Sequence, residues 1–207
     1  MAWSGTLTKR FPVVTLPIVL AALITYATPQ LTDLFIYDRQ LVLGGQLWRL
    51  LTAPFVHFSA SHLIWNLLVF AAAGYVIEIA GYRRFGFVCI LAMVVPSLLF
   101  LAAKPDLTQY GGLSALSTGT TAYLCLCRAQ QASRDRWIWL ALFVLLVVKI
   151  FIEGGIDAPI FAQFAGRPFR VLPSAHAVGV AAAAAIFVSE RRRMPKRHFV
   201  KGTVNYS

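Results

Sequence analysis

The chain consists of six long apolar runs that alternate with short stretches rich in glycine, proline and charged residues. A helix needs about 20 residues to cross the hydrocarbon core of a bilayer, and each run is close to that length. The pattern therefore predicts six membrane-spanning helices. Their approximate bounds are 12–28, 59–80, 85–103, 113–127, 137–153 and 173–189.

Helix-capping and helix-breaking residues set these bounds. Ser59 or Ser61 can cap the start of the second helix, because a serine oxygen accepts hydrogen bonds from the first free backbone amides. Pro96 predicts a kink within the third helix. Gly154 and Gly155 predict the end of the fifth helix.

The composition excludes an ordinary soluble domain. Hydrophobic residues make up 58% of the 207 residues and charged residues only 13%, against about 25% charged in globular domains. Six helices occupy most of the chain, which leaves no room for a separate catalytic module outside the membrane. We therefore expect an all-α polytopic membrane protein with one domain over 1–207. Its core is expected at about 12–189, between a short N-terminal segment, 1–11, and a basic tail, 190–207.

The excess of basic residues has a topological explanation. The chain carries 19 Lys and Arg against 8 Asp and Glu, a formal net charge of +11. In a soluble protein this charge would favour nucleic acid as a partner, but in a membrane protein basic loops mark the cytoplasmic side. Both termini are predicted to be cytoplasmic, and no nucleic-acid partner is expected. The basic residues assigned to that side are Lys9, Arg10, Arg83, Arg84, Arg128, Arg134, Arg136, Arg191, Arg192, Arg193, Lys196, Arg197 and Lys201; those on the other side are Arg39, Arg49, Lys104, Arg167 and Arg170.

The two longest connections, 29–58 and 154–172, both fall on the exoplasmic side in this topology. Connections of that length usually carry function or fold back onto the protein. The first is amphipathic enough to lie in the membrane interface.

The three cysteines, Cys89, Cys125 and Cys127, all fall inside apolar runs. We interpret them as small packing residues, because their positions and number predict neither a disulfide framework nor a redox pair nor a metal site.

Four polar residues stand inside or at the start of the even-numbered helices. His62 and Asn66 are one helical turn apart and share a face of the second helix. Ser114 falls in the first turn of the fourth helix and His176 in the first turn of the sixth. Because the even-numbered helices all enter from the exoplasmic side, we expect these residues at a similar depth in the membrane.

Together these four residues make up the set of groups that acyl transfer requires. A serine hydroxyl is a weak nucleophile without a base, and His176 can serve as that base for Ser114. His62, the Asn66 amide and the Ser114 backbone N–H can donate hydrogen bonds to the oxyanion of a tetrahedral intermediate. Gly111 and Gly112 leave the backbone open to an extended substrate strand.

Other interpretations remain open at this point. A serine at a helix start is often only a cap, and a histidine or asparagine in a membrane helix often only joins helices. A carboxylate orienting His176 could come from Asp106, Glu153 or Asp157, although a Ser/His dyad needs none. His57, His62 and His176 could in principle bind a metal, but no carboxylate joins them at a recognisable spacing, so no metal is expected.

Several motifs surround these residues. They are Trp48-Arg49 with Thr52, then His57-x4-His62-x3-Asn66, then Glu78-x2-Gly81, then Tyr110-Gly111-Gly112-Leu113-Ser114, and last Ala175-His176-Ala177-Val178-Gly179. In this order they resemble the motifs of the rhomboid intramembrane serine proteases, over about residues 48–180.

The resemblance implies a six-helix rhomboid-like bundle in a cell membrane such as the bacterial inner membrane. It implies a serine endopeptidase without a cofactor that cuts membrane-anchored proteins near the exoplasmic face. By the same resemblance Ser114 is the nucleophile, His176 the general base, and His62 with Asn66 the oxyanion donors. Trp48-Arg49 and Glu78 take structural roles.

Two further features refine this hypothesis. The compact six-helix form, Leu113-Ser114-x4-Gly119 and Lys149-x3-Glu153 resemble rhombosortases, which implies removal of C-terminal Gly-Gly sorting signals. The family usually has glycine directly after the nucleophile, whereas this chain has Ala115. The alternative function is therefore an inactive rhomboid-like protein that binds client transmembrane helices. A small transporter is disfavoured, because the polar groups gather in one half of the membrane.

Overall fold

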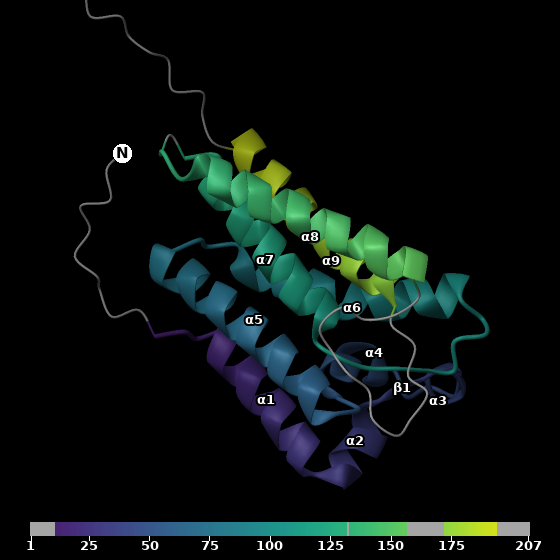
Figure 1. The fold of residues 1–207 in the computed structure, drawn as a ribbon. Helices are drawn as coiled ribbons and strands as arrows, with labels where there is room; N and C mark the ends of the chain where they lie inside the picture. The colour runs from purple at the N-terminus through teal and green to yellow at the C-terminus, as the bar shows by residue number, and fades with distance from the viewer. Residues whose placement is uncertain (1–10, 132, 157–171, 194–207) are drawn as a thin grey trace, which may run out of the picture.

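Six helices of 13 or more residues run along the described part of the chain, and each corresponds to one predicted apolar run. The computed structural model describes residues 11–131, 133–156 and 172–193. Figure 1 shows these helices lying side by side along a common direction. They are α1 (Thr15–Ala27), α5 (Ala60–Ala80), α6 (Phe85–Ala103), α7 (Ser114–Ala129), α8 (Arg136–Ile156) and α9 (Pro173–Arg193).

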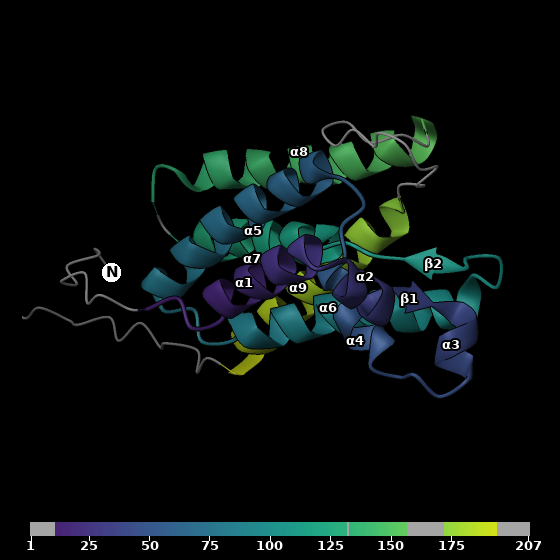
Figure 2. The ribbon, with the colours of Figure 1, turned by 90° about the horizontal axis from the view of Figure 1, so that it is seen from below.

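The predicted connection 29–58 is a folded unit at one end of the bundle, and a second short strand pairs with it (Figure 2). The strands are antiparallel, with Tyr37 opposite Tyr110. Since both tyrosine rings are buried, this unit is packed against the helices. Its elements are α2 (Pro29–Phe35), β1 (Tyr37–Asp38), α3 (Arg39–Leu43), α4 (Arg49–Thr52) and the 3-10 helix η1 (Ala53–Phe55), and β2 is Gln109–Tyr110.

α7 lies at the centre of the bundle and is the shortest of the three C-terminal helices. α7 packs against α5, α6, α8 and α9, and 11 of its 16 residues are buried. Because protein surrounds it, α7 does not need an apolar surface. Among the described residues, four helices are long and apolar enough to cross a membrane, and α1 with α2 pass together as a bent fifth. The all-α polytopic membrane fold is confirmed, and the count of six spans stays a prediction.

Two helices extend further than predicted. α8 continues through Gly154 and Gly155 to Ile156, so the prediction that these glycines end it was wrong. A glycine inside a helix costs only about 1 kcal/mol, which tertiary contacts on either side can offset. α9 continues past Ser189 to Arg193, because Glu190 accepts a hydrogen bond of 2.8 Å from the Tyr123 hydroxyl. The rest of the predicted loop and the tail lie outside the described residues.

Trp48 and Arg49 hold the folded unit together. The buried Arg49 guanidinium donates to the carbonyls of Asp33 and Ile36, both at 2.8 Å, and the Trp48 indole donates to the Leu34 carbonyl at 3.2 Å. These carbonyls belong to the end of α2 and the residue after it, where backbone acceptors lack helical partners. The implied structural role of this pair is confirmed.

Glu78 connects α5 to the start of α1. Its carboxylate accepts hydrogen bonds from the Val14 and Thr15 backbone amides, each at 2.9 Å, and from the Thr15 hydroxyl at 2.6 Å. The first amides of a helix have no partner within it, and a carboxylate there also interacts favourably with the helix dipole. Glu78 therefore caps α1, as the structural role implied for it requires.

Candidate active site

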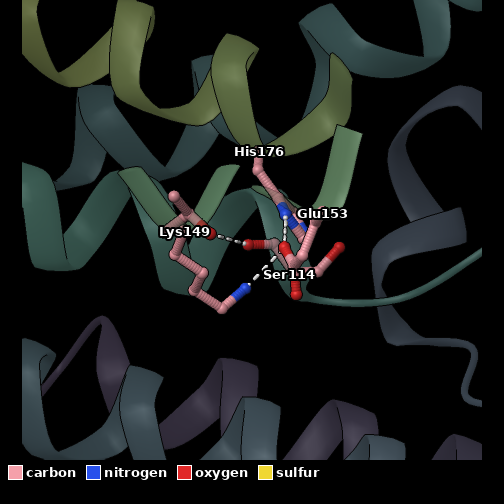
Figure 3. Close-up of polar contacts among 5 residues, drawn as sticks. Ser114, Lys149, Glu153 and His176 are labelled. Atoms are coloured by element: carbon pink, nitrogen blue, oxygen red, sulfur yellow. Dashed lines mark hydrogen bonds and ion pairs between the residues drawn. The ribbon is translucent and has the colours of Figure 1, made fainter. Parts of the chain in front are cut away.

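The backbones of α7 and α9 touch near the N-terminal ends of the two helices. A Cβ added to Gly179 would clash with the Ala115 carbonyl, and one added to Gly119 would lie 2.8 Å from the Gly179 carbonyl oxygen. Only glycine permits this approach. Since Ser114 precedes Ala115 and His176 lies one turn before Gly179, the contact brings the predicted nucleophile and base to neighbouring positions (Figure 3).

Ser114 is the first residue of α7 and is partly exposed. Its carbonyl accepts a 2.7 Å hydrogen bond from the Thr118 hydroxyl, which fixes the first turn of the helix. Within the described residues, no hydrogen bond joins the Ser114 hydroxyl to the His176 ring. Such bonds are often long in a free enzyme and shorten when substrate binds.

His176 contacts a carboxylate from α8. Its Nδ1 lies 3.1 Å from Glu153 Oε2, and the same oxygen accepts a 2.6 Å hydrogen bond from Lys149 Nζ. Figure 3 shows Ser114, Glu153 and His176 gathered in one place. They come from α7, α8 and α9. Of the three candidate acids, Glu153 is thus the one that meets His176, whereas Asp106 is exposed and Asp157 lies outside the described residues.

His57 fixes the segment that leads into Ser114. Its Nδ1 lies 3.2 Å from the Phe55 carbonyl oxygen, and its Nε2 accepts a 3.4 Å hydrogen bond from the Leu113 amide. Burial lowers the pKa of His57 to about 4, so the ring is neutral at neutral pH and has one donor and one acceptor. Both nitrogens are engaged by backbone, which argues against His57 as a metal ligand.

His62 and the glycine pair are packed together. A Cβ on Gly112 would lie 2.6 Å from His62 Cε1, and Gly112 has a φ of +123°, which other residues rarely adopt. Gly111 is equally enclosed, by Val56 and Phe58. The structure thus gives these glycines a packing role. Their predicted role in substrate approach remains untested.

Asn66 has an unpaired donor. Its side chain is buried on α5, and among the described residues its Nδ2 finds no hydrogen-bond partner. Its backbone carbonyl accepts a 3.0 Å bond from the Ser117 hydroxyl, which holds this turn of α5 against α7. An unpaired buried amide costs about 1–3 kcal/mol, so the position is poorly explained by helix packing alone.

Ala115 is accommodated without distortion of α7. It is buried in a small hydrophobic cluster with Ala175 and Tyr110, and α7 continues regularly through it. The methyl group that distinguishes this chain from the usual family pattern therefore lies in the packed core beside α9.

Sequence reasoning left the contact of Glu153 with His176 undecided. The available signal was a carboxylate in an apolar run, but Lys149 one turn earlier offered a sufficient partner.

Across the described residues no group of three His, Cys, Asp or Glu side chains could hold a metal ion.

The fold and this site define a polytopic helical membrane protein whose polar side chains meet at one end of the bundle. The family model of the Rhomboid domain matches residues 44–193, most of the chain. The chain belongs to the rhomboid family, whose members are typically intramembrane serine proteases. No curated protein matches it.

Proposed function

We propose that the protein is an intramembrane serine endopeptidase that uses Ser114 as nucleophile and His176 as general base. The observation that carries the proposal is the glycine-mediated contact of α7 with α9. It supports a Ser/His pair because both residues lie within one turn of the contact. A packing role alone would not require a serine and a histidine together at that end.

The proposed reaction proceeds through an acyl-enzyme. The Ser114 oxygen attacks the scissile carbonyl while His176 takes its proton, and His176 then protonates the leaving amine. Water repeats the sequence on the ester and releases the second fragment. His62 and the unpaired Asn66 amide donate hydrogen bonds to the oxyanion in both steps, in an environment that largely excludes water.

The proposed substrates are membrane-anchored proteins cut near the exoplasmic face, in the form of rhombosortase-type removal of a C-terminal Gly-Gly signal. This is tested with purified protein in liposomes and two single-span reporters. One carries Gly-Gly before its apolar helix and basic tail, and the other carries Val-Val at the same place. We expect cleavage of the first reporter near its Gly-Gly, identified by fragment mass, and little cleavage of the second.

Equal cleavage of both reporters would contradict the Gly-Gly preference but would leave the assignment as a protease intact. Absence of cleavage by folded protein, together with stable binding of the reporter helix, would instead favour the inactive client-binding alternative.

We also propose that both termini are cytoplasmic. The basic residues predicted on the opposite side include Arg49 and Arg39, which bind backbone carbonyls of the folded unit and of α6. These two charges have structural roles and need not act as topology signals. The remaining basic residues are then concentrated even more strongly on the side predicted to be cytoplasmic, which supports the proposed orientation. An alkaline phosphatase fused after Lys196 should be inactive, because that enzyme matures only outside the cytoplasm. An active fusion would contradict the topology.

A further inference from the structure

We propose that Glu153 is a positioning residue that orients His176 for catalysis, so that the site works as a Ser–His–Glu arrangement completed by α8. The inference rests on the proposed function of Ser114 and His176. It adds α8 as a fourth helix to a site otherwise built from α5, α7 and α9.

The hydrogen bond selects one form of the histidine ring. Glu153 Oε2 lies 3.1 Å from Nδ1, and a carboxylate can only accept, so the proton of the neutral ring is on Nδ1. The other nitrogen, Nε2, then carries the lone pair that must receive the Ser114 proton. As that proton arrives, the positive charge on the ring forms beside an ionised carboxylate, which stabilises it.

The burial of Glu153 supports a role beyond packing. It is the one buried residue of α8, with 2% of its surface exposed, while the other side chains of α8 are exposed or half-buried. Removing a carboxylate from water is costly and requires charged or polar partners. Lys149 supplies one such partner, with its Nζ 2.6 Å from Glu153 Oε2.

A purely structural interpretation makes a different prediction. If Lys149 and Glu153 only pair within the membrane, loss of either should lower the melting temperature to a similar extent, and folded molecules should turn over normally. If Glu153 orients His176, its loss should lower kcat, and loss of Lys149 should affect kcat far less than it affects stability.

The test compares Glu153→Gln with Lys149→Met as matched control, and measures kcat, KM and melting temperature on the same purified samples. We expect Glu153→Gln to lower kcat by about 10²–10⁴-fold with KM nearly unchanged, by analogy with amide replacement of an orienting carboxylate. Lys149→Met should lose stability but retain kcat within about tenfold. Full kcat in folded Glu153→Gln would overturn the proposal while leaving the protease assignment intact.

A second measurement does not depend on proteolytic activity. In ¹⁵N-histidine-labelled wild-type protein at mildly alkaline pH, the His176 resonances should show a protonated Nδ1 and an unprotonated Nε2. The His176→Gln sample assigns them. The opposite tautomer would overturn the proposal even if the protease is active, and the predicted tautomer in a protein without proteolysis would place the failure in the proposed function.

Discussion

Ser114→Ala and His176→Ala should each reduce proteolysis by about 10⁴-fold or more while the protein still inserts and folds. The proton of the Ser114 hydroxyl must pass to His176 as the new bond forms, so neither group works without the other. Turnover of a cleavable membrane-anchored reporter, measured on purified protein with its melting temperature, checks the result.

The double variant gives a sharper form of this prediction. Two residues that act as one unit do not lose activity additively, so Ser114→Ala combined with His176→Ala should be no slower than the slower single variant. Ser97→Ala is a matched control. Ser97 is a fully buried serine of α6 whose hydroxyl has no partner among the described residues, and its loss should leave turnover unchanged. Substantial cleavage by Ser114→Ala would contradict the assignment of the nucleophile.

The second large effect concerns the proposed oxyanion donors. His62→Ala and Asn66→Ala should each lower kcat by about 10²–10³-fold with little change in KM, because the charge they stabilise develops only in the transition state. Both lie on one face of α5, so the double variant should be little worse than the worse single one. Steady-state kinetics on the folded fraction separates these effects from loss of protein.

The two single variants, His62→Ala and Asn66→Ala, should differ in melting temperature. The His62 ring packs beside Gly112 and lies 4.9 Å, centre to centre, from the His57 ring, so truncation leaves a cavity and lowers the melting temperature. The Asn66 amide has no partner to lose among the described residues, so Asn66→Ala should be nearly neutral for folding. Normal turnover per folded molecule in both single variants would remove these residues from the site and leave the backbone amides at Ser114 as the donors.

The long helices were the predictable part of the fold. Apolar runs of membrane length fix their number and approximate place, and local caps such as Ser59, whose oxygen accepts the His62 amide at 3.1 Å, are readable from sequence. The end of α8 could not be predicted from sequence, because Glu153 contacts His176 on another helix. A pair of glycines alone does not end a helix that is held in this way. The pairing of β1 with β2 was equally hidden, since each strand has only two residues.

The residues of the candidate site could be predicted from type and depth, but their contacts could not. Ser114 and His176 follow from the chemistry that their pairing allows, whereas the approach of α7 to α9 depends on Gly119 meeting Gly179, 60 residues later. The contact of Glu153 with His176 likewise depends on how α8 is rotated against α9. Such rotation is set by packing of the whole bundle and leaves no pattern in either helix alone.

The central claim is that Ser114 is an activated nucleophile, and the most direct measurement is covalent labelling by a fluorophosphonate. Purified wild-type protein should gain one adduct, and peptide mass analysis should map it to Ser114. His176→Ala should label far more slowly, because the hydroxyl then lacks its base. A folded wild-type protein that gains no adduct at Ser114 under conditions that label other serine hydrolases would contradict the account.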